Sequence, residues 1–442
     1  MKRRLHLCGV LAAALPLIWQ TAEAGYVFTN GSLSGEATLD IGAGNIISRN
    51  VNFGTGRVDI RNGENTGTSA TWQEGYLKPG LTLNYQLNDD WALVGGGSVV
   101  SATTLGDGDA GGFSRSSDGK TAVEELYAGV HYRQWTLTLG RQNFMVGNGF
   151  IVMDGNLDFL KDGAYWLGPR SAFRDAAVLS WDNKALQAQA FSLRTDSDIG
   201  DFRLTGANVD YNLNDQVTLG AMALGVATIA DSSQSTSRDG MRVYDLRALH
   251  GVLPGVPNLT LNAEMAWQKG SNSTTEYDAS AWYLQGDYQF ASLPMQPTIG
   301  YRYASFSGDD DLTDNTSKAW DPLSKGFIDW GTWLIGDVVG NYLMNNSNEN
   351  VHQLSAKLQL NDAFTLGAMH YQFWLDKNNF LGTVVESKHF ADESVIYLDY
   401  APNEKFYSSL SYNWVTPQSA AREFFGDDKK FSAIELYFTY KY

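Results

Sequence analysis

The chain ends with FSAIELYFTYKY, from Phe431 to Tyr442, and this stretch alternates apolar and mainly polar side chains. The apolar side chains of one parity are Ile434, Leu436, Phe438, Tyr440 and Tyr442. Successive side chains of a β-strand point to opposite faces, so the pattern predicts a strand with one apolar face and one polar face. In a soluble protein the apolar face would be the buried one, and one strand cannot exclude that alternative.

The same alternation recurs along the whole chain and predicts eighteen strands. Their predicted ranges are 32–42, 72–87, 91–103, 121–132, 135–144, 173–181, 185–194, 202–213, 217–229, 241–250, 258–268, 280–290, 297–306, 350–360, 364–375, 394–401, 406–415 and 431–442. An even number of strands places both ends of the chain on the same side of a closed sheet.

Short and long connections between these strands alternate along the chain. Short ones carry residues typical of tight hairpins, as in Asn88-Asp89-Asp90 and Asn361-Asp362-Ala363. Long Gly-, Ser- and Asp-rich segments lie between them, near 44–70, 104–120, 145–172, 307–349, 376–393 and 416–430. Short turns at one end and long loops at the other are typical of outer-membrane barrels. The sequence therefore predicts an all-β, transmembrane antiparallel β-barrel, and a soluble all-β protein does not explain the connections.

The first residues predict a signal peptide. Lys2, Arg3 and Arg4 precede an apolar stretch, and Ala22-Glu23-Ala24 provides an A-x-A cleavage site. We expect residues 1–24 to be removed and residues 25–442 to form a single barrel domain in the bacterial outer membrane. The one cysteine, Cys8, lies in the segment to be removed, so the mature chain should have no disulfide or thiolate chemistry.

Composition limits the possible partners. The chain of 442 residues has a formal net charge of −17, so it should not bind nucleic acid through its overall charge. After the N-terminal segment, no stretch offers the ~20 apolar residues that a spanning helix needs. The expected partners are outer-membrane lipid, and the membrane's assembly machinery, which would read the terminal strand ending at Tyr442.

A barrel this wide leaves an aqueous channel, and the polar parity of each strand predicts the residues that line it. Acids of that parity include Glu36, Asp40, Glu125, Asp210, Asp245, Glu264, Asp287 and Asp399, and bases include Arg174, Arg247, Arg302 and Lys357. Most such charges are expected to pair along the wall, and a few near a constriction should set selectivity. The candidate pore-lining residues are Arg174, Arg247, Arg302, Asp245, Glu264, Asp287 and Lys357.

Two longer stretches carry a resemblance. One is LGRQNFMVGNGFIVMDGNLDFLKDGAYWLGPRSAFRDAAVLSW, from Leu139 to Trp181, which holds a Gly-Arg-Gln, a Gly-rich loop and a returning strand with Phe173-Arg174-Asp175. The other is WDPLSKGFIDWGTWLIGDVVGNYL, from Trp320 to Leu343, followed downstream by Tyr371-Gln372-Phe373. Both resemble the alginate-export family of bacterial outer-membrane β-barrel proteins.

The resemblance implies an 18-stranded monomeric barrel with a long loop folded over or into the pore. Residues 145–172 and 307–349 are the candidates for that loop. The alginate exporter of this family uses an arginine-rich constriction to attract a polyanion, whereas the lumen residues predicted here include more acids than bases. The implied function is a channel that passes a polysaccharide or another hydrophilic solute; the alternative is a substrate-specific uptake porin for small molecules.

A barrel enzyme or a surface adhesin is the other class of function to weigh. The histidines His131, His250, His352, His370 and His389 form no zinc-binding motif, and no G-x-S-x-G motif is present. Asp309, Asp310, Asp311 and Asp314 could hold calcium but lack the spacing of an EF-hand, which favours a solvated external loop. We therefore expect neither enzymatic activity nor a cofactor or metal.

Overall fold

The structure is a computed structural model that describes residues 25–213, 216–229, 238–253, 255–311, 313–326 and 336–442. The expected signal peptide, residues 1–24, lies outside the described residues. In the described part of the chain, no helix is long and apolar enough to span a membrane.

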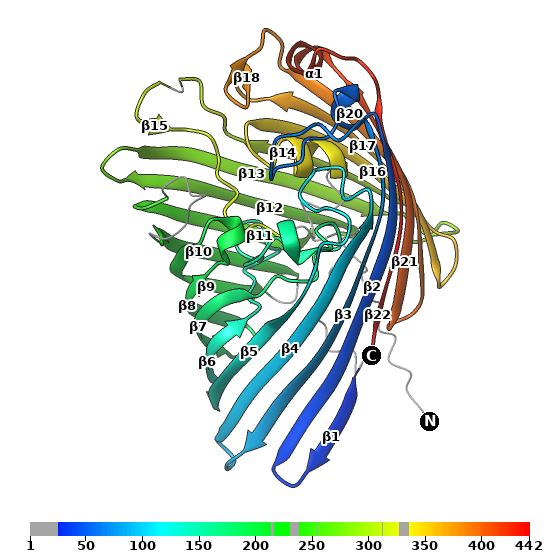
Figure 1. Cartoon of the computed structure of the whole chain (residues 1–442). Coiled ribbons are helices and arrows are strands. Elements are labelled where there is room, and N and C mark those ends of the chain that lie inside the picture. The colour runs from blue at the N-terminus through cyan, green and yellow to red at the C-terminus, as the bar shows by residue number, and fades with distance from the viewer. Residues whose placement is uncertain (1–24, 214–215, 230–237, 254, 312, 327–335) are drawn as a thin grey trace.

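One antiparallel sheet closes on itself to form the barrel (Figure 1). The sheet contains 20 strands, of which the short β1 (Tyr26–Asn30) and β15 (Thr316–Ser317) are additions to an 18-strand cylinder. The cylinder consists of β2 (Leu33–Arg49), β3 (Ser69–Gln86), β4 (Trp91–Gly106), β5 (Gly119–Tyr132), β6 (Trp135–Gln142), β7 (Phe173–Asp182), β8 (Leu186–Arg194), β9 (Phe202–Leu213), β10 (Val217–Thr228), β11 (Met241–Leu253), β12 (Val256–Ser271), β13 (Glu276–Gln289), β14 (Thr298–Phe306), β16 (Glu349–Gln359), β17 (Phe364–Leu375), β20 (His389–Asn403), β21 (Phe406–Pro417) and β22 (Phe431–Lys441). The predicted fold class and each predicted strand are confirmed.

The barrel closes between its first and last long strands. β2 pairs with β22 from Asp40 to Arg49, and below that point β1 takes the same edge of β2. The backbone N–H of Tyr442 donates to Leu39 O at 3.0 Å, and Leu39 N–H donates to Tyr442 O at 2.7 Å. β1 was not predicted, and β2 runs to Arg49 rather than ending near residue 42. The extra length of β2 is needed because β22 pairs with it up to that residue.

The two parities of each strand face different surroundings. On β22, Leu436 is 48% exposed on the outer face while Glu435 is 2% exposed on the inner face. Exposed apolar side chains of the same outward parity occur on neighbouring strands, for example Leu410 on β21 and Leu354 on β16. The apolar parity therefore faces lipid and the polar parity faces the lumen, as the alternation predicts.

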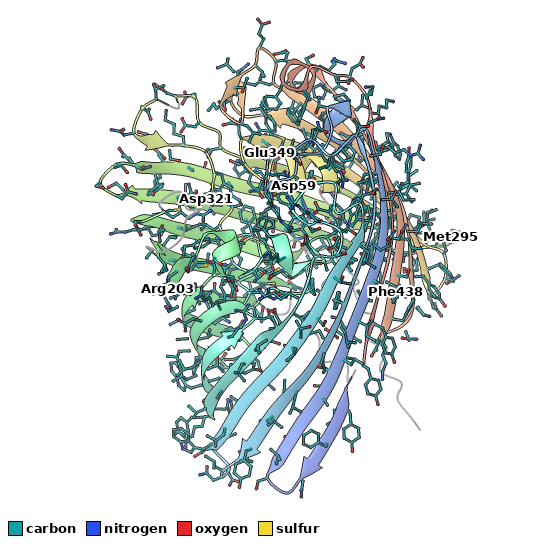
Figure 2. All side chains as sticks on the ribbon, in the orientation of Figure 1. Asp59, Arg203, Met295, Asp321, Glu349 and Phe438 are labelled. Carbon is teal, nitrogen blue, oxygen red and sulfur yellow. The ribbon has the colours of Figure 1, made fainter. Side chains whose placement is uncertain are left out.

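The two ends of the barrel differ in their connections. The turns at the lower end in Figure 1 are tight, and Arg133 adopts a left-handed φ of 55° in the turn between β5 and β6. The opposite end carries longer segments, which include β18 (Asn379–Phe380), β19 (Thr383–Val384) and the helix α1 (Ser419–Phe425). Further short helical turns are η1 (Val51–Gly54), η2 (Leu160–Asp162), η3 (Ser197–Ile199) and η5 (Gly336–Leu343). Side chains crowd this end of the barrel, where Asp59, Asp321 and Glu349 are labelled in Figure 2.

Candidate pore constriction

Two long connections fold into the barrel, although the start of the second, with β15 paired to the start of β13, lies at the rim. We call residues 143–172, between β6 and β7, the first inserted loop, and the described residues of 307–348, between β14 and β16, the second inserted loop. Each contributes buried apolar side chains to the interior: Phe150, Ile151 and Val152 from the first, Trp320, Val338 and Val339 from the second. Described residues of both segments that the family resemblance indicated as pore loops thus enter the lumen.

The two inserted loops are joined through their backbones. Asp154 N–H donates to Ser324 O at 2.9 Å, and Gly326 N–H donates to Gly149 O at 2.8 Å. Val152 and Ser324 also form an isolated parallel β-bridge. Because backbone groups hold this contact, it fixes how the two loops lie relative to each other inside the barrel.

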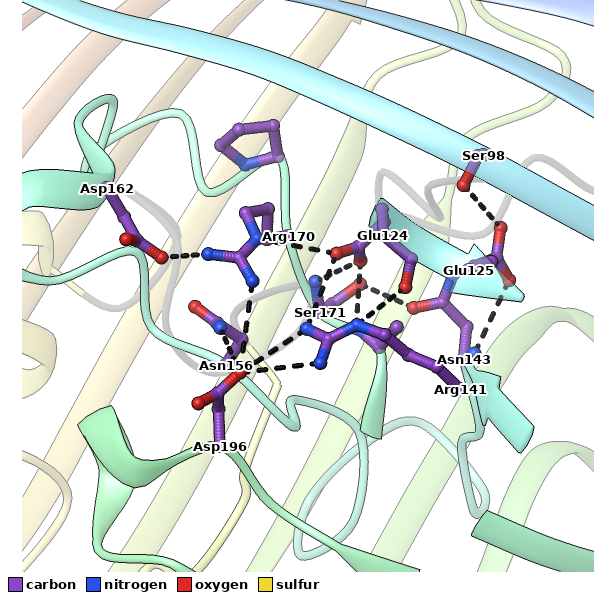
Figure 3. Close-up of polar contacts among 12 residues, drawn as sticks. Ser98, Glu124, Glu125, Arg141, Asn143, Asn156, Asp162, Arg170, Ser171 and Asp196 are labelled. Atoms are coloured by element: carbon purple, nitrogen blue, oxygen red, sulfur yellow. Dashed lines mark hydrogen bonds and ion pairs between the residues drawn. The ribbon is translucent and has the colours of Figure 1, made fainter. Parts of the chain in front are cut away.

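The base of the first inserted loop is held by Arg170 (Figure 3). Its guanidinium forms an ion pair with Asp162 at the start of the loop's return, and lies 3.6 Å from Glu124 of β5 and 3.8 Å from Asp196. Arg170 and Glu124 are buried. Asn156, on the same loop, donates to Asp196 at 3.3 Å. Since a buried charge is tolerated only with partners, Arg170 links the loop to the wall.

The Glu124 carboxylate binds the backbone of the first inserted loop where the chain returns to the barrel wall. Its Oε1 accepts from the backbone N–H groups of both Ser171 and Ala172 at 2.8 Å, where the loop leads into β7. Arg141 of β6 donates to the Glu124 backbone carbonyl at 2.9 Å. The register between β4 and β5 shifts at Ser98, which leaves Glu124 as an extra residue in β5. This bulge explains why strict alternation predicted Glu125 for the lumen and missed Glu124.

The first inserted loop reaches across to the wall formed by β11–β13. The backbone of Gly147 lies against the Arg247 side chain so closely that an added Cβ would sit 2.9 Å from its Cδ. Asn148 Nδ2 donates to the Tyr283 hydroxyl at 2.7 Å, and Tyr283 donates to Glu264 at 3.3 Å. Residue 147 has a left-handed φ of 58° and no room for a Cβ atom beside Arg247, and glycine is the residue that suits both conditions.

Four of the predicted lumen charges meet beneath this tip. Arg247 forms ion pairs of 2.6 Å with Asp245 and with Asp210, and its side chain is 0% exposed. Glu264 is the cross-strand partner of Arg247. The Arg247 cluster, comprising these four residues, therefore holds three carboxyl groups around one covered guanidinium.

A second group lies along β13–β16. Arg302 donates to Gln285 Oε1 at 2.9 Å, and Gln285 donates to Asp287 at 2.6 Å. Lys357 of β16 is the cross-strand partner of Thr298 and is only partly covered. These residues form part of the lumen wall rather than of the inserted loops.

Arg174 lies apart from both groups. Gly140 pairs with Ala176 but Gln142 pairs with Phe173, so a β-bulge falls at Arg174 and Asp175. The Arg174 side chain is 43% exposed and 3.8 Å from Asp201 in the β8–β9 connection. The structure thus does not bring Arg174 together with Arg247 and Arg302, because the bulge interrupts the alternation from which its direction was predicted.

A basic group on the opposite wall was not among the candidates. Asp40 of β2 has Lys78 of β3 and Lys441 of β22 as its cross-strand neighbours. Lys78 also donates to the carbonyl of Pro169 in the first inserted loop at 3.0 Å. The signal was present in the sequence, since both lysines fall on the polar parity of their strands.

Burial shifts the titration of charged groups in the inserted loops. Desolvation raises the pKa of Asp154 and of Asp158 well above the ordinary range, although Lys325 and Arg170 respectively oppose the shift. Burial also lowers the pKa of Lys325 to about 8. Lys325 Nζ donates to Asn346 at 2.6 Å within the second inserted loop. Asp154 of the first inserted loop and Lys325 of the second therefore influence each other's protonation.

Metal-binding geometry is absent from the part of the chain that the structure describes, where no cluster of three or more His, Cys, Asp or Glu side chains could hold an ion. In the acidic segment, Asp309 accepts backbone N–H bonds from Asp311 and Lys318 at 3.1 Å, which is the role of a loop-shaping residue.

A family model described as alginate export matches residues 114–383, which is more than half of the chain. The chain belongs to this family. As an alginate-export family barrel it lies in the bacterial outer membrane, and it forms a channel there. The matched segment includes both inserted loops in full.

Solved structures of Pseudomonas aeruginosa porins share the fold of this alginate-export family barrel. OpdL matches with a TM-score of 0.58 and 13% identity over 92% of this chain and 98% of its own. OpdK with vanillate matches with a TM-score of 0.56 and 14% identity, over 92% of this chain and 98% of its own. OccK5 (OpdH) matches with a TM-score of 0.53 and 14% identity, over 92% of this chain and 97% of its own. No protein with curated functional information matches.

Proposed function

We propose that this barrel is a passive channel for small hydrophilic solutes and that the two inserted loops select them. The observation that carries the proposal is the contact between the loops, through Gly149, Asp154, Ser324 and Gly326. An 18-stranded barrel without such loops leaves a wide aqueous channel. A connection fixed by backbone bonds inside it restricts the passage to solutes that fit beside the loops.

The fold neighbours support this proposal over passage of a polymer. They are porins, and OpdK was solved with vanillate, a small aromatic carboxylate. At 14% identity the likeness concerns the fold, so it suggests which solutes to test rather than which one this channel takes. Passage of a polyuronate is the second candidate, and the alginate-export description of the matching family favours it.

Liposome swelling separates the two candidates. Purified barrel in vesicles is exposed to monosaccharides, small carboxylates such as vanillate, and uronate oligomers of increasing length. We expect swelling rates to fall steeply beyond the size of a disaccharide, because the loops exclude longer solutes. Equal permeation by long uronate oligomers and by monosaccharides would favour the polymer channel instead.

We further propose that charge preference depends on Arg302 and Lys357 more than on Arg247. Arg247 is fully covered and paired with two carboxylates, so its charge is compensated locally. Lys357 is only partly covered, and charges near a narrow low-dielectric passage act on ions strongly. Asp287 lies in the group with Arg302, whereas Asp245 and Glu264 compensate Arg247.

Reversal potentials under a salt gradient test this assignment. The double variant Arg302→Gln/Lys357→Gln should shift the preference of the channel toward cations, and Arg174→Gln, in the rim bulge, should leave it unchanged. An unchanged potential in the double variant, or an equal shift in Arg174→Gln, contradicts the assignment.

We also propose that the mature protein begins at Gly25, immediately before β1. The A-x-A motif supports this, as does the position of Tyr26 at the start of the strand that extends the barrel seam. Mass spectrometry of the protein from isolated outer membranes should find Gly25 as the first residue; an intact Met1 would contradict it. We propose in addition that the assembly machinery of the outer membrane recognises the terminal strand, which ends at Tyr442.

A further inference from the structure

Four basic side chains gather on the outer wall of the barrel, at the end that carries the long loops. Arg194 ends β8 and Arg203 lies at the start of β9, on the wall where Figure 2 labels it. Arg242 lies at the start of β11 and Lys269 near the end of β12. We call these four residues the outer basic patch.

Strand parity shows that the patch faces outward. On β9 the residues of Arg203 parity include Val209, which is exposed, while Leu204 of the other parity is buried. On β11 the residues of Arg242 parity include Leu246, 55% exposed, and those of the other parity include Val243, 0% exposed. The patch therefore shares its face with the lipid-exposed apolar side chains, not with the lumen.

Aromatic neighbours set the depth of the patch. Arg242 and Lys269 are cross-strand partners, and the next outward-facing pair toward the membrane centre is Tyr244 and Trp267. One such step along two strands is about 7 Å. Aromatic girdles mark the membrane interface of outer-membrane barrels, so the cations above this pair lie at the level of the lipid headgroups.

Like charges stand directly opposite each other in this patch. Arg194 pairs in register with Arg203, and Arg242 with Lys269, an arrangement that destabilises a sheet unless anions intervene. Asp201 compensates Arg194 at 2.7 Å, Asp175 compensates Arg203 at 2.7 Å, and Asp278 pairs with Lys269. Among the described residues, Arg242 has no ion-pair partner.

Only small side chains of β10 separate Arg203 from Arg242 on the outer face. The strand between them, β10, presents only small side chains outward at this height, where Ala227 is opposite Arg203 and Gly225 opposite Arg242. An added Cβ on Gly225 would meet no atom within 4 Å, so the space above it is open. The two arginine backbones are two strand spacings apart across the sheet and two residues apart along it, about 12 Å in all. This separation is within reach of one shared anion.

We propose that the outer basic patch binds a phosphate group of an outer-leaflet glycolipid, with an acyl chain lying along β10 below it. Arginine guanidinium groups bind phosphate through paired, charge-assisted hydrogen bonds. The phosphate supplies the anion that Arg242 otherwise lacks, and the small residues of β10 admit a hydrocarbon chain against the barrel. This lipid site is separate from solute passage through the lumen.

Native mass spectrometry in detergent tests the site, with diphosphoryl lipid A and its dephosphorylated form as probes. The test variants are Arg242→Gln and Arg203→Gln/Arg242→Gln. The matched control is Arg49→Gln, which removes an exposed outward arginine at the same end of β2, far from the patch in the sheet order. Each variant is first shown to be folded by its heat-dependent migration in gels.

The wild type and Arg49→Gln should retain diphosphoryl lipid A. The double variant should bind this lipid at least about 10-fold more weakly, as expected for the loss of charged hydrogen bonds. Dephosphorylated lipid A should bind the wild type no better than it binds the double variant. Equal retention of diphosphoryl lipid A by folded wild type and double variant overturns the proposal. So does equal binding of the two lipids by the wild type.

Discussion

A single guanidinium, that of Arg170, connects the returning end of the first inserted loop to the barrel wall. It is buried among Asp162, Glu124 and Asp196, which come from the loop, from β5 and from the β8–β9 connection. One side chain therefore joins three segments that are distant in sequence. This makes Arg170 a positioning residue for the constriction, because it holds the loop without lying at its tip.

Replacing Arg170 by Met should loosen the first inserted loop. The change takes one buried cation from this group, but Asp162 keeps Lys120 and Asp196 keeps Arg141. The loss should therefore be smaller than the about 3–5 kcal/mol typical of a buried charge that loses its only partner. We expect trypsin to cleave faster at the exposed Lys161 in the same loop, while the barrel remains folded. Arg133→Met, which removes an exposed pair with Asp90 at a short turn, is the control. Resistance to cleavage equal to that of the wild type would show that Arg170 does not anchor the loop.

Outward and inward positions of one strand should respond differently to a charge. Leu354→Arg, on the lipid face of β16, should destabilise the barrel by about 2–4 kcal/mol if this mid-strand position lies near the bilayer centre. Ser355→Arg places the same side chain on the lumen face and should cost little. Urea titration of refolded protein in lipid vesicles measures both free energies, and equal losses would contradict the assignment of faces.

At the residue scale, alternation indicates the direction of a side chain where the strand is regular. Arg247, Asp245 and Glu264 lie on regular stretches of β11 and β12, and their inward direction is set by parity alone. Arg174 and Glu124 lie at bulges, and a single extra residue reverses the faces of the residues after it. No local feature of the sequence identifies those bulges, so the sequence did not predict where these two side chains point.

At the scale of elements, the contact between the inserted loops carries a titratable group that allows a pH test. Burial lowers the pKa of Lys325 in the second inserted loop to about 8. In the unfolded chain a lysine titrates near ~10.4, so between these values the unfolded state binds more protons. The Lys325 contribution to stability therefore increases as the pH rises from 8 to 10.

Lys325→Met should remove this pH dependence. Unfolding free energies of wild type and variant are measured in parallel from pH 7 to pH 10.5, so that groups common to both cancel in the difference. We expect the wild type to gain relative to the variant, with a slope of at most ~1.4 kcal/mol per pH unit. A difference that is constant with pH would mean that Lys325 is not desolvated in the folded protein.

Strands could be predicted from sequence far better than the paths of the loops between them. The alternation that marks a strand is a local property of consecutive residues. The entry of residues 143–172 and of residues 320–326 into the lumen depends on contacts such as Gly326 to Gly149, between residues that lie far apart in the chain. Composition alone shows these segments as long and Gly-rich, and only the family resemblance singled them out.

At the scale of the whole molecule, the barrel combines a lipid-facing surface, a charged lumen wall and an internal constriction. The wall places the Arg247 cluster and the Arg302–Asp287 group on β9–β16, and Asp40 with its two lysines on β2, β3 and β22. The inserted loops contact both walls, through Asn148 on one side and Pro169 on the other. Solutes must therefore pass beside loops that are held at both ends.

The central claim, that the inserted loops narrow the channel, is tested most directly by single-channel conductance in planar bilayers. The variant replaces residues 146–153 of the first inserted loop with a short Gly-Ser linker, and the control makes a similar replacement of residues 381–384, at the exposed β18–β19 hairpin. We predict that shortening the first inserted loop raises the conductance clearly above that of the wild type and of the control. A folded variant whose conductance equals that of the wild type would contradict the claim.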